Sequence, residues 1–164
     1  MHVLDWSNPH QKYFEQISAI PHPSEGEKAL SDFVVSAAER LGLRWRQDEK
    51  WNVVVWKDAS PGMEQAAPVM LQAHMDMVCV KTPDSTHNFE KDSLKLYVDA
   101  EGNLRARDTT LGADDGYGVA YLLAVMEEDF PHPPLELVFT SQEENGCWGA
   151  KALDMSDIRA RRMI

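Results

Sequence analysis

Residues 112–146 read GADDGYGVAYLLAVMEEDFPHPPLELVFTSQEENG, and the order of signals within them decides the fold class. Residues 116–128 are apolar on nearly every face of a helix, which is the pattern of a buried helix. The proline-rich run at 131–134 ends that helix. Residues 135–140 then form a short apolar run typical of a strand covered on both faces of its sheet. A buried helix followed by a buried strand favours an α/β arrangement.

The segments before this stretch continue the alternation of helices and strands. Apolar residues at helical spacing predict a helix over 9–20, and Pro21-His22-Pro23 ends it. Ser24 and Glu27 form a capping-box pattern that predicts the start of a second helix, which runs to Leu41. Apolar and β-branched runs predict strands at 45–48, 51–56 and 68–73, and a hairpin from 94–99 and 103–107. We therefore expect an α/β sandwich.

Composition limits the functions open to the chain. Its 164 residues are 43% hydrophobic and 26% charged, which is ordinary for one globular domain or part of one. The formal net charge of -11 repels phosphate backbones, so no nucleic acid partner is expected. No window holds the roughly 18 apolar residues of a membrane span, and the first residues lack a secretory signal. Because Cys79 and Cys147 also fit free thiols in a reducing compartment, we expect a cytoplasmic protein with no membrane partner.

Three groups of polar residues stand where apolar segments begin or end. His74-Met75-Asp76 follows a predicted strand, and side chains two apart share a face there. A carboxylate that orients a histidine is the usual partner of a zinc ligand, although a capped strand end explains the same residues. Asp114-Asp115 precedes the buried helix, where carboxylates can cap the helix or bind a metal. Glu143-Glu144 follows the buried strand, and a solvated loop is the alternative to a metal site there.

Taken together, the three groups favour a hydrolytic metal site. In α/β sheets, ligands gather at the carboxyl ends of the strands. Histidine and carboxylates are ligands for Zn²⁺ or Mn²⁺, and a pair of metals needs a bridging carboxylate. Of two neighbouring glutamates, one can be a ligand and the other a proton acceptor.

Four motifs, in this order, resemble the co-catalytic zinc peptidases related to aminoacylase and carboxypeptidase G, and within them the aminoacyl-histidine dipeptidase group. They are AIPHPS at 19–24, HMDMV at 74–78, TTLGADDG at 109–116 and TSQEENG at 140–146. The resemblance covers essentially the whole chain. It implies a three-layer sandwich with a mixed central sheet flanked by helices. Residues 1–164 would be the N-terminal part of the catalytic domain, since residues 157–164 end as if a new strand were beginning. The lid or dimerisation domain and the rest of the catalytic domain would lie beyond residue 164.

Carried over motif by motif, the resemblance implies roles for five side chains. His74 would bind one zinc ion, Glu144 would bind the other, and Asp114 would bridge both. Asp76 would orient His74, and Glu143 would be the general base. The remaining metal ligands would lie beyond residue 164.

Two residues depart from the family pattern without removing a ligand. Asp108 stands where glycine is expected, and Asp115 stands where relatives often have asparagine. The resemblance also implies a cis peptide bond between Asp114 and Asp115.

The activity implied is hydrolysis of the peptide bond of dipeptides, with Xaa-His dipeptides as the expected type. Two Zn²⁺ ions, which Mn²⁺ or Co²⁺ could replace, would activate the attacking water, and Glu143 would accept its proton. The full-length protein is expected to be a homodimer, and the 164-residue chain is expected to be inactive by itself. Two alternatives stay open: another amidohydrolase of the group, such as an acylase, a tripeptidase or a carboxypeptidase, or a catalytically dead relative that only binds.

Overall fold

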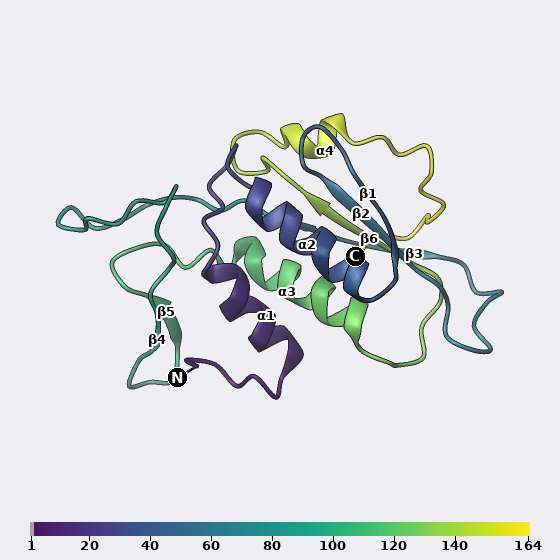
Figure 1. The fold of residues 1–164 in the computed structure, drawn as a ribbon, viewed down its shortest axis with the longest axis horizontal. Helices are drawn as coiled ribbons and strands as arrows, with labels where there is room; N and C mark the ends of the chain where they lie inside the picture. The colour runs from purple at the N-terminus through teal and green to yellow at the C-terminus, as the bar shows by residue number, and fades with distance from the viewer. Residues whose placement is uncertain (1) are drawn as a thin grey trace.

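The computed structural model describes residues 2–164, so Met1, the first residue of the predicted domain range, lies outside it. Along the described chain, two helices are followed by five strands, and a helix, a strand and a short helix complete the order (Figure 1). In chain order they are α1 (Pro9–Ser18), α2 (Lys28–Arg40), β1 (Arg44–Gln47), β2 (Val53–Lys57), β3 (Val69–His74), β4 (Leu96–Val98), β5 (Leu104–Ala106), α3 (Ala113–Glu127), β6 (Leu135–Thr140) and α4 (Trp148–Ala152).

A four-stranded mixed sheet in the order β1-β2-β6-β3 forms the centre of the fold. Its inner strand β6 pairs antiparallel with β2 and parallel with β3. All six residues of β6 are buried, as expected for a strand covered on both faces. In the parallel pair Val69 aligns with Leu135 and His74 with Thr140, so β3 and β6 end at the same edge of the sheet. The predicted mixed α/β class is confirmed.

The helices α1, α2 and α3 cover one face of the sheet (Figure 1). Helix α3 packs against β3 on one side and against α1 on the other, which explains why its sequence is apolar nearly all round. The main core lies in this layer and includes Phe14, Leu123, Val55 and Phe139. The helical layer thus fixes the start of α3 beside the end of β3.

The opposite face of the sheet has a smaller core, formed by Val54, Trp56, Val138 and Ile158. Glu136 faces this side and is 3% exposed, and its carboxylate accepts the backbone amides of residues 159 and 160 at 2.8–3.0 Å. Among the described residues, the second layer of the sandwich therefore consists of the segment 153–160 and the short α4.

Residues 162–164 pair with the outer edge of β3. The amide of Met70 donates to Arg162, and the amide of Ile164 donates back to Met70. Met163 forms a parallel bridge with Met70. Where a strand was expected to begin, the described residues form a short bridge to β3.

The second helix begins by a different mechanism from the predicted capping box. Helix α2 starts at Lys28, and no side chain caps it. Ser24 instead donates to the Asp76 carboxylate at 2.6 Å, and Glu27 accepts the amide of Gln142 at 2.8 Å. The capping-box prediction is wrong because both side chains contact the polar edge of the sheet instead of the first turn of the helix.

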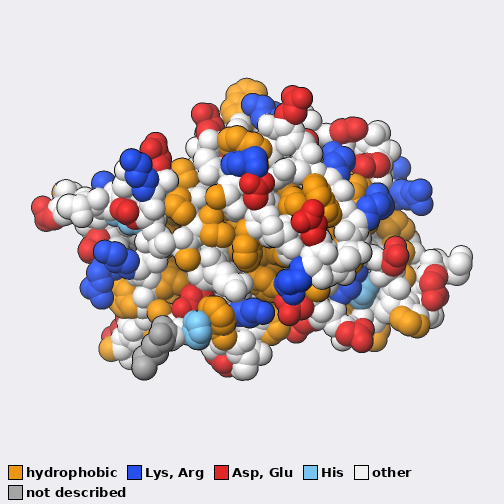
Figure 2. Space-filling view, viewed as in Figure 1, with side chains coloured by type: hydrophobic (Ala, Val, Ile, Leu, Met, Phe, Trp, Pro, Cys, Tyr) orange, Lys and Arg blue, Asp and Glu red, His pale blue; other side chains and the backbone are white. Residues whose placement is uncertain are grey.

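Between β3 and α3 the chain leaves the sheet and forms a side lobe that contains the β4–β5 hairpin (Figure 1). Acidic and basic side chains are scattered among apolar ones on the face shown in Figure 2. Within residues 2–164, none of the helices combines the length and the apolar character that a membrane crossing requires.

Candidate metal centre

Three chain segments meet at the carboxyl edge of the parallel strands. His74 is the last residue of β3, and Asp76 follows it two residues later. Glu143 and Glu144 lie in the turn after β6, and Asp114 lies at the start of α3. Since parallel strands end at one edge, this topology brings together residues that are up to 70 positions apart in the sequence.

The side chains of these segments lie within metal-binding distance of one another. His74 Nε2 is 3.0 Å from Asp114 Oδ1 and 4.0 Å from Glu143 Oε2. One ligand atom each from His74, Glu143 and Glu144 can be chosen so that all three lie within 4.8 Å of one another. Asp114 lies outside that group of three and reaches it through its contact with His74, while 89% of its side chain is exposed.

The carboxylate of Asp76 lies beneath this cluster and is fully buried. Its Oδ1 is 3.5 Å from His74 Nδ1, although the nearest partner of Nδ1 is the Asp76 backbone oxygen at 3.0 Å. The same carboxylate accepts Ser24 Oγ at 2.6 Å and the amides of Glu143 and Glu144 at 2.9 and 3.1 Å. Burial acts to raise the pKa of Asp76, but these hydrogen bonds outweigh it and hold the pKa well below its usual range. Asp76 therefore contacts the predicted histidine ligand and also holds the backbone of the glutamate pair.

The charges of the cluster are unbalanced. Burial lowers the pKa of His74, but the carboxylates of Asp76 and Asp114 outweigh burial and raise it to about 9. In the described part of the chain, every ion pair of these carboxylates is with His74, and none is with lysine or arginine. Burial, together with the nearby acids, raises the pKa of Glu144. One imidazole among several carboxylates is a donor set that fits divalent zinc, so these residues are suited to hold the implied metal.

The two aspartates at the start of α3 have different surroundings. The peptide bond between them is cis, as expected, and both residues depart from helical backbone angles. Asp115 accepts the amide of Gly118 at 3.1 Å and so caps the first turn of the helix. Asp114 instead turns its carboxylate towards His74. The capping interpretation therefore describes Asp115, and the metal-site interpretation describes Asp114.

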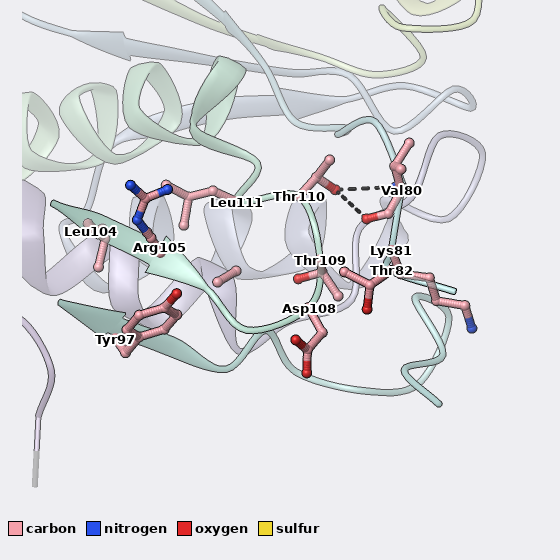
Figure 3. A pocket seen from close by; sticks show the side chains of 11 residues that line it. Val80, Lys81, Thr82, Tyr97, Leu104, Arg105, Asp108, Thr109, Thr110 and Leu111 are labelled. Carbon is pink, nitrogen blue, oxygen red and sulfur yellow. Dashed lines mark hydrogen bonds between the residues drawn. The ribbon is translucent and has the colours of Figure 1, made fainter. Parts of the chain in front are cut away.

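The other departure from the family pattern lies in the side lobe. Asp108 has a φ of +60°, a left-handed conformation that glycine adopts without strain, which explains why glycine is favoured at this position. It lines a pocket of about 560 Å³ between segments 80–82 and 104–111, shown in Figure 3. Thr110 bonds to both Val78 and Val80 in this lobe. Because the lining does not include His74 or the glutamate pair, this pocket is separate from the cluster.

Sequence reasoning missed several contacts of the cluster. Cys147, which was expected to be a free thiol, is half-buried, and its thiol donates to Glu143 Oε1 at 3.5 Å. Ser24 was assigned to a helix cap, yet it bonds Asp76. Glu143 and Cys147 lie four residues apart in one turn, whereas Ser24 and Asp76 lie in separate parts of the chain. Only the second contact therefore has no local signal in the sequence.

Comparisons with known proteins identify relatives that are peptidases. The model of Peptidase family M20/M25/M40 matches residues 70–161, which is more than half of the chain. Cytosol non-specific dipeptidase from Escherichia coli (strain K12) is 43% identical over 152 residues, covering 92% of this chain and 31% of that protein. The structure of aminoacylhistidine dipeptidase from Vibrio alginolyticus matches with a TM-score of 0.90 and 40% identity, over 94% of this chain and 32% of that one.

A tripeptidase from Staphylococcus aureus shares the fold, with a TM-score of 0.78 and 24% identity over 99% of this chain and 43% of that one. The chain spans about a third of the length of the two dipeptidases. With a family match over more than half its length, the chain belongs to Peptidase family M20/M25/M40.

Proposed function

We propose that the chain is the N-terminal part of the catalytic domain of a metal-dependent dipeptidase. The observation that carries the proposal is the meeting of His74 with Asp114, Glu143 and Glu144 at one sheet edge, with no lysine or arginine paired to them in residues 2–164. Membership of a peptidase family supports peptide hydrolysis, and two relatives of at least 40% identity are named as dipeptidases.

Each polar side chain has a distinct task in this proposal. His74 and Glu144 would each hold one of two zinc ions, and Asp114 would hold both. When bound, the ions would supply an activated water and polarise the scissile carbonyl group. Glu143 accepts the proton of the attacking water and later donates it to the leaving amine. Asp76 orients the His74 imidazole and fixes the Glu143 backbone, which keeps the base beside the ligands.

The names of the relatives support a proposed substrate and location, and the family resemblance supports a proposed assembly. Dipeptides of the Xaa-His type are the proposed substrates because the Vibrio alginolyticus relative is an aminoacylhistidine dipeptidase. The Escherichia coli relative is named non-specific, so hydrolysis of many different dipeptides is the alternative result that a substrate assay must distinguish. Its name also supports a cytoplasmic location. A homodimer with a lid domain is proposed for the complete protein on the basis of the family resemblance.

The 164-residue chain by itself is proposed to be inactive. Each ion would have the shared Asp114 and only one further ligand, His74 or Glu144. Catalytic zinc sites normally use about three protein ligands, so both sites would be one ligand short.

The test separates the base from a ligand in the complete protein. Glu143→Gln should lower kcat for an Xaa-His dipeptide by at least about 100-fold while zinc content stays at the wild-type level, because a general base contributes about 10²–10⁴-fold. Glu144→Gln should lose zinc instead. A Glu143→Gln enzyme that kept more than about a hundredth of the rate would remove Glu143 from the role of base. Assays with N-acylated amino acids and tripeptides distinguish a dipeptidase from the other amidohydrolases, and no hydrolysis of any substrate would indicate a relative that only binds.

A further inference from the structure

The backbone amides of the segment that carries the glutamate pair are held by side chains from other parts of the fold. Four consecutive amides, from Ser141 to Glu144, each donate to a side-chain oxygen. Asn52 accepts the first at 3.0 Å, Glu27 accepts the second at 2.8 Å, and Asp76 accepts the last two. Asn52 precedes β2, Glu27 precedes α2 and Asp76 follows β3, so three separate parts of the fold hold these amides. The carbonyl groups of Gln142 and Glu143 instead accept local backbone amides from residues 146–148.

One of these contacts, the bond from Glu27 to the Gln142 amide, comes from a short turn at residues 23–27. The turn 23–27 closes with a hydrogen bond from Gly26 to Pro23 and forms a parallel bridge to Met77. From it, Ser24 bonds Asp76, Glu25 accepts the side-chain amide of Asn145 at 3.1 Å, and Glu27 accepts the Gln142 amide. The turn therefore contacts the glutamate segment on both sides of the pair. Its first two residues, Pro23 and Ser24, end the AIPHPS motif, to which the proposed mechanism gives no task.

Glu27 is the most deeply placed of these side chains. It has no exposed surface, and it does not cap the helix that it precedes. Its Oε1 bonds Gln142, whereas its Oε2 has no hydrogen-bond partner among residues 2–164. Burial raises the pKa of Glu27, so the charged form is less favoured here than in water. The bond to Gln142 is a positional contact that needs one acceptor oxygen at the right depth, and glutamine would offer such an oxygen at the same chain length.

The position of the Gln142 amide sets the direction of the next two residues. Gln142 itself is 7% exposed and has a φ of +54°, where the chain turns out of β6. Without an acceptor this buried amide would be unpaired, and the turn would have to shift to reach water. Such a shift would move Glu143 and Glu144 together relative to His74.

We propose that Glu27 is a positioning residue, which holds the Gln142 amide so that Glu143 and Glu144 face His74. The inference rests on the proposed function, since it assigns the glutamate pair to catalysis. Glu27 acts through the backbone and touches neither substrate nor metal.

The test compares two substitutions of Glu27 in the complete protein. Glu27→Asp keeps the acid but withdraws the acceptor by one methylene group, whereas Glu27→Gln keeps an acceptor oxygen at full length. We expect Glu27→Asp to lower kcat about 10- to 100-fold, because ångström-scale misplacement of a reacting group can cost about 100-fold. KM should stay within about threefold of wild type and zinc binding should weaken, whereas Glu27→Gln should keep wild-type kcat and zinc content.

Glu15→Asp is the matched control. Glu15 also accepts two backbone amides, those of Val3 and Leu4, but it lies on α1 and is not among the residues that contact the cluster. The control should keep the wild-type kcat. Wild-type kcat in Glu27→Asp, an equal loss in Glu27→Gln, or an equal loss in the control would each overturn the inference.

Hydrogen exchange of residues 141–144 provides a readout that needs no activity. Glu27→Asp should speed the exchange of these amides, and Glu15→Asp should leave it unchanged. If the wild-type protein hydrolyses no dipeptide, the proposed function fails, and the exchange result then decides the positional role of Glu27 by itself. Unchanged exchange in Glu27→Asp would overturn that role.

Discussion

Replacing Asp76 by asparagine removes an acceptor from the most heavily bonded carboxylate of the cluster. Its Oδ1 accepts Glu143 N and lies near His74, and its Oδ2 accepts Ser24 Oγ and Glu144 N. Asparagine keeps only one oxygen. Its NH₂ group can donate to the Ser24 hydroxyl. In either orientation of the side-chain amide, however, this NH₂ group lies against the backbone N–H of Glu143 or Glu144, and that N–H loses its acceptor.

The expected loss follows from these contacts. One bond from an amide to a charged acceptor is lost, at about 1.5–3 kcal/mol, and the bonds that remain become weaker neutral ones. The pairing of His74 with a buried carboxylate is lost as well. Part of this is offset, because the neutral amide no longer carries the cost of burying a charge. We expect the free energy of unfolding of the metal-free protein to fall by about 2–4 kcal/mol.

The loss should depend on pH. The pKa of Asp76 is lowered in the folded state, so its charge stabilises the protein above its ordinary pKa of 3.8, and this contribution is lost as pH falls through the lowered folded value. His74 has a raised pKa of about 9, so its contribution is complete below its ordinary value of 6.5 and is lost as pH rises through 9. The difference between wild type and Asp76→Asn should therefore be largest between these two ordinary values.

Urea unfolding in the presence of a chelator, at pH 5.5 and across the pH series, measures this difference. Asp58→Asn, at an exposed position, is the control and should leave the midpoint unchanged. A loss below about 0.5 kcal/mol in Asp76→Asn, the range of ordinary surface substitutions, would refute the reasoning. A large loss that does not change with pH would show that the carboxylate charge is not the cause.

Three further outcomes are expected. In metal-free protein the His74 imidazole should titrate near pH 9 by NMR, and a value near 6.5 would contradict its pairing with the carboxylates. Gly118→Ala should lower stability by about 1–3 kcal/mol in calorimetry, because its Cβ would lie 2.3 Å from Asp115 Oδ1 and would displace the helix cap. Phe139→Ala, in the core of β6, should cost about 3–5 kcal/mol in urea unfolding, whereas Val98→Ala, 48% exposed, should stay within about 0.5 kcal/mol. Equal losses at these two positions would contradict the assignment of the core.

The regular elements were predictable from the sequence because their signals are local. The strand 135–140 was placed with its observed bounds, since an apolar run between proline and polar residues leaves little choice. The buried helix was expected at 116–128 and begins three residues earlier, at Ala113. Helix starts depend on capping contacts, and here the cap comes from Asp115 across a non-helical stretch.

The contacts that support the candidate site could not be predicted from the sequence. Ser24 and Glu27 match a capping box by spacing, but each finds its partner after a separate element has packed beside it. Asn52 falls within the strand predicted at 51–56, yet its side chain accepts the amide of Ser141, 89 positions away. Spacing along the chain shows which residues share an element, whereas these bonds depend on how the elements pack.

The alignment of β3 with β6 limits where insertions can be accepted. Strand β3 is preceded by the segment 58–68, and β6 is preceded by the segment 128–134. Both segments lie at the end of the sheet opposite the cluster, and hydrogen bonds between Ser60 and His132 join them. Residues added at the exposed tip of the first segment would leave the strands in place. One residue added inside β3 would turn the His74 imidazole to the other face, away from the glutamates. Length variation among homologues should therefore accumulate at the entry end of the sheet, while the two strands keep a constant length.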